Sequence, residues 1–194
     1  MPTEKRLAKI KKVLQARQTD LTVVCENIHD PHNVSAICRS CDAVGVSDVY
    51  LLYTNEPFPR LGRKSSASAK KWLEFHRYKS HTDLQKFLHS LNMRIYAACT
   101  EPSSKSIYEI DWRHPSAIIM GNEHRGVSKA GLKIADQTIY IPMVGMVESL
   151  NVSVATAVIL YEAFRQRQGA GKYKQVCDKN WFDRHFRKWT DPEL

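Results

Sequence analysis

The chain has no apolar run long enough to cross a membrane, and its N-terminus lacks the apolar segment of a secretion signal. Its five cysteines are an odd number scattered through expected core elements, which favours a reducing cytoplasm over a disulfide framework. The patterns GxGxxG and GxxxxGK[ST] are missing, which argues against dinucleotide and ATP sites. No HExxH motif or matched set of metal ligands is visible, so the sequence predicts no metal site.

The positive charge is concentrated at the two ends. The 194 residues carry a net charge of +9 and are 43% hydrophobic, which fits one α/β domain with short attached elements. Residues 1–20 hold six Lys and Arg against two acidic residues, and residues 162–194 hold eight against five. Basic ends on a nearly neutral centre predict a polyanionic partner, and nucleic acid is the first candidate. The alternative is that these charges only form a solvated surface.

Apolar runs of strand length alternate with helical patterns, which predicts a parallel, Rossmann-like α/β sheet. We expect strands over residues 21–25, 48–52, 72–75, 94–99, 116–120 and 137–141, and helices over residues 34–44, 80–91, 128–135 and 151–167. Residues 100–106 are expected to form turns. Asn33 is placed to cap the first of these helices and Gly45 to end it.

The two ends are expected to be helical extensions of the domain. Thr3 can cap a basic helix whose Leu7, Ile10 and Leu14 make an apolar stripe that docks on the domain. Residues 178–189 combine aromatic and basic side chains in a helix that packs on the domain or on a second subunit. The expected division is a basic N-terminal helix (1–19), the α/β domain (20–168) and a basic, aromatic C-terminal tail (169–194).

The most unusual stretch is the loop of residues 141–151, which separates a predicted strand from a helix. Met143, Val144, Met146, Val147 and Leu150 are apolar where a connecting loop is normally polar. We expect this loop to form a backbone pocket for a small molecule; a loop packed on its own core is the alternative.

Three loops each follow a strand and precede a helix: residues 33–39, 121–126 and 145–151. In a parallel sheet such loops gather at one edge, where ligands bind. Together they supply an arginine, a carboxylate, amides and a hydroxyl, so we expect them to form one site. The CxxC pair Cys38 and Cys41 lies inside a helical pattern with apolar neighbours, which indicates two buried thiols rather than a redox or zinc site.

Three segments carry a family resemblance: NVSAICRSCDAVGV, IIMGNEHRGVS and IPMVGMVESLNVSVATAVILYEAFRQR. In this order they resemble the three motifs of the SpoU (TrmH) branch of the SPOUT RNA 2′-O-methyltransferases, over about residues 21–167. The resemblance implies an α/β domain with a deep trefoil knot in its C-terminal part, working as a homodimer. It also implies S-adenosylmethionine as cofactor, held bent by loop backbone near Ala98, Gly121, Ile141 and Leu150.

The resemblance places the catalytic arginine on Arg39 and its supporting polar residues on Asn33, Glu123, Ser149 and Asn151. Arginine is a poor base because its pKa exceeds about 12. We therefore expect Arg39 to hold the phosphate beside the target and to favour the alkoxide, with action as a base as the alternative. Asn33 and Ser149 are expected to hold substrate, and Glu123 to hold Arg39 or a loop in place. For Asn33 and Asn151, helix capping alone is the alternative.

Short basic extensions at both ends are similar to members that methylate the ribose 2′-hydroxyl of guanosine 18 in the D-loop of tRNA. Ribosomal RNA or another tRNA position is the first alternative, although relatives acting on ribosomal RNA often carry an additional N-terminal domain. A non-catalytic RNA-binding protein of the same fold is the second, and the intact Arg39 and third motif speak against it. This chain reads His124-Arg125 where relatives often carry Lys or Arg with Trp or Thr, a difference that bears on loop packing or RNA contact.

The residues expected to contact tRNA phosphates lie in two basic segments. A long loop over residues 55–69 is basic and rich in hydroxyl groups, and loops of that length tend to be functional. The expected RNA-binding residues are Lys5, Arg6, Lys9, Lys11 and Lys12 in the N-terminal helix, with Arg60, Arg63 and Lys64 in the loop.

Overall fold

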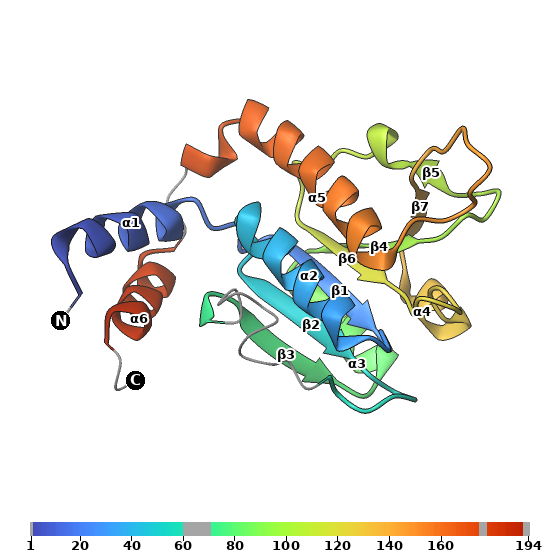
Figure 1. The fold of residues 1–194 in the computed structure, drawn as a ribbon, viewed down its shortest axis with the longest axis horizontal. Coiled ribbons are helices and arrows are strands. Elements are labelled where there is room, and N and C mark those ends of the chain that lie inside the picture. The colour runs from blue at the N-terminus through green and yellow to red at the C-terminus, as the bar shows by residue number, and fades with distance from the viewer. Residues whose placement is uncertain (1, 60–70, 175–177, 192–194) are drawn as a thin grey trace.

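The computed structural model describes residues 2–59, 71–174 and 178–191. In this part of the chain the predicted parallel sheet is confirmed: seven strands pair in the order β3-β2-β1-β6-β4-β7-β5, and every pair is parallel (Figure 1). The strands are β1 (Leu21–Glu26), β2 (Asp48–Leu52), β3 (Glu74–Tyr78), β4 (Arg94–Ala98), β5 (Lys105–Ser106), β6 (Ser116–Met120) and β7 (Gln137–Tyr140).

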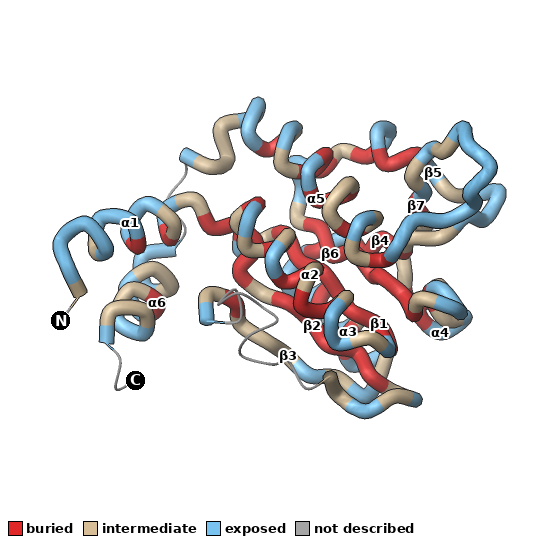
Figure 2. The backbone as a smooth tube through the Cα atoms, viewed as in Figure 1, coloured by how far each residue is buried: buried red, intermediate tan, exposed pale blue. Residues whose placement is uncertain are grey.

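The two central strands are the most fully buried, because helices cover both faces of the sheet. Every residue of β1 and β6 is buried (Figure 2). Helices α2 (Pro31–Ala43) and α5 (Val152–Gly169) contribute to one core cluster, and α3 (His81–Ser90) and α4 (Lys129–Ile134) contribute to the other. The sheet is therefore the middle layer between two pairs of helices.

The strand order reverses between β1 and β6. From β1 the chain moves outward through β2 to β3, and it then returns to build the other half of the sheet, in which β6 lies next to β1 and β4 lies beyond it. In open parallel sheets such a switch point leaves a crevice at the carboxyl ends of the strands, and ligands bind there. The carboxyl end of this sheet is therefore the edge on which to look for sites.

The terminal helices α1 (Glu4–Gln15) and α6 (Lys179–Thr190) pack against each other at one end of the molecule (Figure 1). Thr3 caps α1 as expected, and Ile10 and Leu14 of the apolar stripe are buried. Helix α6 in turn contacts the domain through the Trp189 ring, 4.9 Å from the Trp72 ring. A short 3-10 helix, η3 (Lys172–Lys174), follows α5.

Three local predictions were wrong. Helix α2 begins at Pro31 and is capped by Asp30 rather than Asn33, because proline at the first helical position loses no hydrogen bond and already has a helical φ. The strand expected at residues 72–75 lies at residues 74–78. Residues 100–106 were expected to be turns only, but Lys105–Ser106 pairs with β7 as the edge strand β5, before the 3-10 helix η2 (Ile107–Glu109).

Within the described residues, none of the helices combines the length and the apolar character needed to cross a membrane. Cys25, Cys38 and Cys41 are buried and carry free thiols. Burial raises the pKa of the Cys38 thiol to about 12 and raises that of Cys41 well above its usual range, so both stay protonated near neutral pH. The expectation of two buried helical thiols at the CxxC pair is confirmed.

Candidate functional site

A cavity of about 810 Å³ opens at the carboxyl ends of β6, β4 and β7. Its lining comes from four segments, at residues 98–102, 120–127, 139–143 and 148–159. All four residues expected to bind the cofactor line it, and so do three of the five expected catalytic residues. These seven are Ala98, Gly121, Ile141 and Leu150, with Glu123, Ser149 and Asn151.

Backbone makes one wall of this cavity, because the chain doubles back on itself after β6. Asn122 and Gly126 exchange two backbone hydrogen bonds, of 3.0 and 2.8 Å, and Gly126 has a φ of +66°. A Cβ atom on Gly121 would lie 2.1 Å from the carbonyl carbon of Gly126, so only glycine fits there. The Asn122 side chain accepts hydrogen bonds from the backbone N–H groups of His124 and Arg125, which fixes the turn.

Glu123 at the tip of this turn fastens the start of α2. Its carboxylate accepts hydrogen bonds from the backbone N–H of His29 and Asp30, at 2.9 and 3.1 Å, and from Asn33 Nδ2 at 2.8 Å. Burial alone would raise the pKa of Glu123, but these hydrogen bonds outweigh burial and hold the pKa below its usual range. Of the two expectations for Glu123, the contacts are those of a residue that holds a loop.

An amide bridge joins the two helices that face the cavity mouth. Asn151 Nδ2 donates to Asn33 Oδ1 at 3.1 Å, while Asn151 Oδ1 accepts from the backbone N–H groups of Ser153 and Val154. Asn151 therefore caps α5, as predicted, and also reaches α2. The hydrogen-bonded series Asn151–Asn33–Glu123 joins residues from all three predicted segments, although residues 33–39, expected to be a loop, lie inside α2.

Arg39 lies apart from the cavity. It is exposed on α2, six residues beyond Asn33 and so about 9 Å further along the helix axis, and it does not line the cavity. Among the described contacts Glu123 forms no ion pair with Arg39, so the alternative in which Glu123 holds the arginine is not what the structure shows. Ser149 is exposed and lines the cavity close to Asn151.

The apolar loop after β7 does not pack on its own core. Val144 is 106% exposed, Met146 is 100% exposed and Val147 is 63% exposed, while Met143 and Leu150 line the cavity. Residues of this loop line the cavity and the alternative of a loop buried on itself is excluded, while a small molecule held by loop backbone stays a prediction. Three large apolar side chains remain in contact with water.

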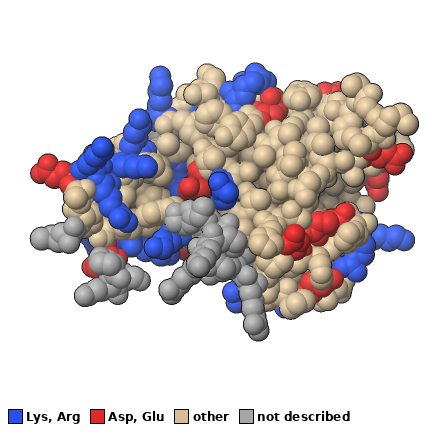
Figure 3. All heavy atoms as spheres, in the orientation of Figure 1, with Lys and Arg blue, Asp and Glu red and all other residues tan. Residues whose placement is uncertain are grey.

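The N-terminal basic residues lie on one exposed face. Lys5, Arg6, Lys9, Lys11 and Lys12 of α1 are all exposed, and Figure 3 shows Lys and Arg gathered over this end of the molecule. Lys11 also lies 5.6 Å from the centre of the Phe186 ring on α6. Arg60, Arg63 and Lys64, the other expected RNA-binding residues, lie outside the described residues.

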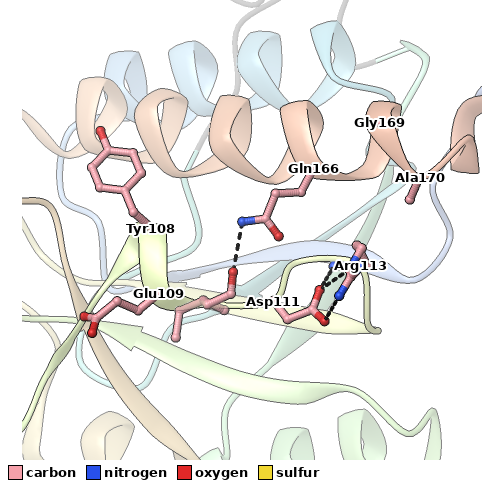
Figure 4. Close-up of a pocket in the computed structure, with 8 residues that line it drawn as sticks. Tyr108, Glu109, Asp111, Arg113, Gln166, Gly169 and Ala170 are labelled. Atoms are coloured by element: carbon pink, nitrogen blue, oxygen red, sulfur yellow. Dashed lines mark hydrogen bonds and ion pairs between the residues drawn. The ribbon is translucent and has the colours of Figure 1, made fainter.

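Another hollow, of about 460 Å³, lies beside the C-terminal half of α5 (Figure 4). Its polar groups are largely occupied by each other: Arg113 donates two side-chain hydrogen bonds to Asp111, and Gln166 Nε2 donates to the Ile110 carbonyl. The hydrogen bonds from Arg113 hold the pKa of Asp111 well below its usual range.

Sequence reasoning missed Glu26 and Asn122. Glu26 is 1% exposed, and its carboxylate accepts from Ser128 N at 2.9 Å, from Ser128 Oγ at 2.6 Å and from His81 Nε2 at 2.6 Å. His81 and Ser128 reach the same oxygen of Glu26, so the three do not form a serine–histidine–acid relay, in which the histidine stands between the other two. For Glu26, the only signal in the sequence was that an acidic residue ends an apolar strand. Among the described residues, no group of three or more His, Cys, Asp or Glu is placed to hold a metal ion.

Comparison with known proteins finds a matching family and a similar enzyme. The model of the SpoU rRNA Methylase family matches residues 20–161. A tRNA (guanosine(18)-2′-O)-methyltransferase of Thermus thermophilus is 45% identical over 174 residues, which is 88% of each chain.

Two solved structures are similar in fold. The A. aeolicus TrmH/SpoU tRNA modifying enzyme has a TM-score of 0.91 and 35% identity, covering 98% of both chains. The SpoU methyltransferase AviRb of Streptomyces viridochromogenes, in complex with the cofactor AdoMet, has a TM-score of 0.69 and 27% identity, covering 78% of this chain and 59% of that one.

Proposed function

This chain belongs to the SpoU rRNA methylase family, and we propose that it transfers the methyl group of S-adenosylmethionine to the ribose 2′-hydroxyl of a guanosine in tRNA, at position 18 in the D-loop. The observation that carries the proposal is the similarity, over most of the chain, to an enzyme named for that reaction. The cavity at the carboxyl ends of β6, β4 and β7 is the site at which the reaction would take place.

The residues of this cavity fit the cofactor. A volume of about 810 Å³ lies within the range of pockets that bury small molecules. The close backbone approach at Gly121 leaves main-chain groups rather than side chains on one wall, and Ile141 and Leu150 give apolar surface on another. We propose that these residues and Ala98 hold S-adenosylmethionine, which supplies a methyl group already activated by a positively charged sulfur.

The methyl group needs no further activation, so the tasks left to the protein are to align the ribose 2′-hydroxyl with it and to favour loss of the hydroxyl proton. The bridge from Asn151 through Asn33 to Glu123 fixes the mouth of the cavity, where the ribose would enter. We propose that Asn33 and Ser149 hold the ribose, and that Glu123 holds the loop before α2 against the cavity.

Arg39 is proposed to act from outside the cavity, further along α2. Exposed and about 9 Å along α2 from Asn33, it is suited to bind a phosphate next to the target nucleoside. Its positive charge would also favour the alkoxide form of the hydroxyl.

The exposed apolar loop supports a homodimer. Val144, Met146 and Val147 of this loop and Val154 and Tyr161 of α5 are large apolar side chains that are exposed, and such surface on a protein marks a contact site. We propose that a second copy of the chain covers them. The proposal further includes the trefoil knot, which rests on the family resemblance, and a cytoplasmic location.

We propose that residues 1–19 and 169–194 extend the tRNA-binding surface of the domain at residues 20–168. The packing of α1 on α6 and the exposed lysines of α1 support this division. Nucleic-acid phosphates contribute most of the affinity in such contacts, so these lysines would set the salt dependence of binding more than the rate of methylation.

The experiment is transfer of radiolabelled methyl from S-adenosylmethionine to unmodified tRNA, with the methylated nucleoside mapped. The proposal expects 2′-O-methylguanosine at position 18. Transfer to ribosomal RNA alone would contradict the proposal that tRNA is the substrate. Cofactor binding without transfer to either RNA would favour a non-catalytic RNA-binding protein.

A further inference from the structure

The turn after β6 forms one wall of the large cavity and ends at the start of α4. Residues 120–127 line the cavity along this wall, and Ser128 directly after them caps α4. A ligand that contacts backbone is placed only as well as that backbone is held. Residues that hold the turn therefore bear on cofactor binding even where they line no wall of the cavity.

The carboxylate of Glu26 holds the end of the turn. Glu26 is the last residue of β1 and is 1% exposed, and it accepts hydrogen bonds from Ser128 N at 2.9 Å and from Ser128 Oγ at 2.6 Å. The carboxylate also lies 2.6 Å from His81 Nε2, at the start of α3. Burying a carboxylate is costly unless its oxygens are hydrogen-bonded, so this Glu26 network (Glu26, His81 and Ser128) fixes Ser128 against β1. None of the three residues lines the large cavity.

Gly131 of α4 shows how closely the Glu26 network is fitted to the turn. A Cβ atom at this buried position would lie 2.8 Å from both carboxylate oxygens of Glu26 and 2.7 Å from Val127 Cγ1. Glycine is among the least favourable residues inside a helix, so its presence here keeps α4 in close contact with both groups. Val127 lines the large cavity, and the close packing therefore reaches from Glu26 to the cavity wall.

The beginning of the turn is also tied to β1. Asn122 Nδ2 donates to the carbonyl of Asn27 at 2.8 Å. Asn27 has a φ of +48°, which is uncommon for a residue other than glycine, and its Oδ1 accepts from two backbone N–H groups that follow β2. The turn is thus held at both of its ends by consecutive residues of one strand end, Glu26 and Asn27.

We propose that Glu26 is a positioning residue for methyl transfer: acting through Ser128, its carboxylate holds the turn after β6 where the backbone of the turn binds S-adenosylmethionine. This inference rests on the proposed function. A residue that only stabilises the fold lowers the free energy of unfolding and leaves cofactor affinity unchanged in the folded protein. A positioning residue changes cofactor affinity as well, and this difference separates the two roles.

The first test compares two serine hydroxyl groups. Ser128→Ala removes the hydroxyl that donates to Glu26, and Ser116→Ala is the matched control at the opposite end of β6, where Ser116 Oγ donates to the His114 carbonyl at 2.8 Å. Three quantities are measured for each variant. They are the free energy of unfolding in urea, the Kd for S-adenosylmethionine by calorimetry, and the hydrogen exchange of the Gly126 amide, which donates within the turn.

We expect Ser128→Ala to weaken cofactor binding by roughly 3- to 10-fold, the value of one hydrogen bond. Exchange of the Gly126 amide should become faster, because the turn opens locally more often. Ser116→Ala should lower the unfolding free energy and leave both other quantities close to those of the wild type. The proposal is overturned if the two variants have the same cofactor affinity and the same exchange.

The second test changes the fit around the carboxylate without removing a hydrogen-bonding group. Gly131→Ala places a methyl group against Glu26 and Val127, so we expect weaker cofactor binding. Gly169→Ala is the control, because a Cβ on Gly169 at the end of α5 meets nothing within 4 Å. Cofactor affinity equal to that of the wild type in folded Gly131→Ala would contradict the proposal.

The third test substitutes Glu26 itself. Glu26→Gln keeps the size of the side chain and an oxygen that can accept from Ser128 N, whereas Glu26→Ala keeps neither. We expect Glu26→Ala to raise the KM for S-adenosylmethionine and not the KM for tRNA, and Glu26→Gln to recover most of the loss. A folded Glu26→Ala variant with unchanged cofactor affinity would show that Glu26 only stabilises the fold. If Glu26→Ala does not fold, the serine and glycine pairs decide.

Failure of the proposed function gives a different result, because hydrogen exchange needs neither cofactor nor tRNA. If the wild type neither binds S-adenosylmethionine nor methylates tRNA, but Ser128→Ala alone speeds exchange in the turn, the proposed reaction is wrong and the hold of Glu26 on the turn stands. Normal methylation at guanosine 18, with equal exchange and equal cofactor affinity in Ser128→Ala and Ser116→Ala, rejects the positioning role alone.

Discussion

The two ends of α5 carry polar networks of opposite character. At the N-terminal end, Asn151 bridges to Asn33 and onward to Glu123, at the mouth of the large cavity. At the C-terminal end, the buried Arg167 donates to Asp20 and Gln18 and to the carbonyls of Trp112, His114 and Asp20. Lys172 of η3 also donates to Asp20.

The difference lies in what each network leaves open. The Arg167 guanidinium is 0% exposed and every one of its nitrogens donates to a protein oxygen, so a ligand finds nothing to bind. Burial raises the pKa of Asp20, but Arg167 and Lys172 outweigh burial and hold it below its usual range. The N-terminal network is partly exposed and borders a cavity. A closed network holds the fold, and an open one at a cavity edge is available for chemistry.

Removing Arg167 should give the largest effect, because it leaves the carbonyls of Trp112, Asp20 and His114 without their buried donor. We expect Arg167→Met to lower the free energy of unfolding by about 3–5 kcal/mol, measured by urea denaturation. Arg113→Met is the control, since Arg113 is 60% exposed and pairs with Asp111, whose side chain is 38% exposed. It should hardly change stability. Equal effects of the two substitutions would contradict the comparison.

Arg39→Ala, on α2, should impair the reaction rather than the stability of the fold. We expect methyl transfer to fall by at least about 100-fold, a typical loss when one charge-stabilising donor is removed. The unfolding free energy and the dissociation constant for S-adenosylmethionine should stay close to those of the wild type, because Arg39 is exposed and lies outside the cavity. A large loss of cofactor affinity would show that Arg39 does not act on the phosphate.

Substitutions of Asn151 can separate its two roles. The same side chain caps α5 and donates a hydrogen bond to Asn33 of α2. Asn151→Ala should lower the unfolding free energy by about 1 kcal/mol and also slow methyl transfer, since the cap of α5 and the bridge to Asn33 are both lost. Asn151→Ser keeps a capping hydroxyl but is too short to reach Asn33. It should recover the stability and not the rate. Full recovery of both by serine would mean that Asn151 acts only as a cap.

Substitution of Glu123 should give the smallest change in stability of these variants, and the change should depend on pH. Its pKa in the folded chain is lowered, so its contribution to stability is present above the unfolded value of about 4.3 and is lost as pH falls through the folded value. The stability difference between the wild type and Glu123→Gln should therefore be largest near neutral pH and shrink in acid. Urea unfolding at several pH values between 7 and 3 measures it. A difference that grows in acid would have the wrong sign.

Local patterns in the sequence were sufficient to predict most of the fold. Short apolar runs predict the buried strands β1 and β6, and an asparagine before an apolar helical pattern predicts the cap at Asn151. Both signals act locally. Patterns failed where a long-range contact decides. Trp72 packs on Trp189 of α6 rather than in a strand, and the two-residue β5 is too short to show any period.

The candidate site divides in the same way. The large cavity was predictable because apolar loop residues and a tight glycine turn are visible in the sequence, and the family resemblance supplied the expected roles of Arg39 and Glu123. The Glu26 network was not predictable, because Glu26, His81 and Ser128 meet only through the order of the strands. The contacts of Glu123 with the backbone before α2 also depend on that order.

The most direct test of the account is calorimetric titration of S-adenosylmethionine into a variant whose cavity is filled, Leu150→Trp. Leu150 lines the large cavity at the N-terminal end of α5, whereas Leu91 is similarly exposed at the end of α3 and lines none of the described cavities, so Leu91→Trp is the control. If this cavity is the methyl-donor site, Leu150→Trp weakens cofactor binding strongly and Leu91→Trp binds like the wild type. Unchanged binding by folded Leu150→Trp would place the cofactor elsewhere and contradict the account.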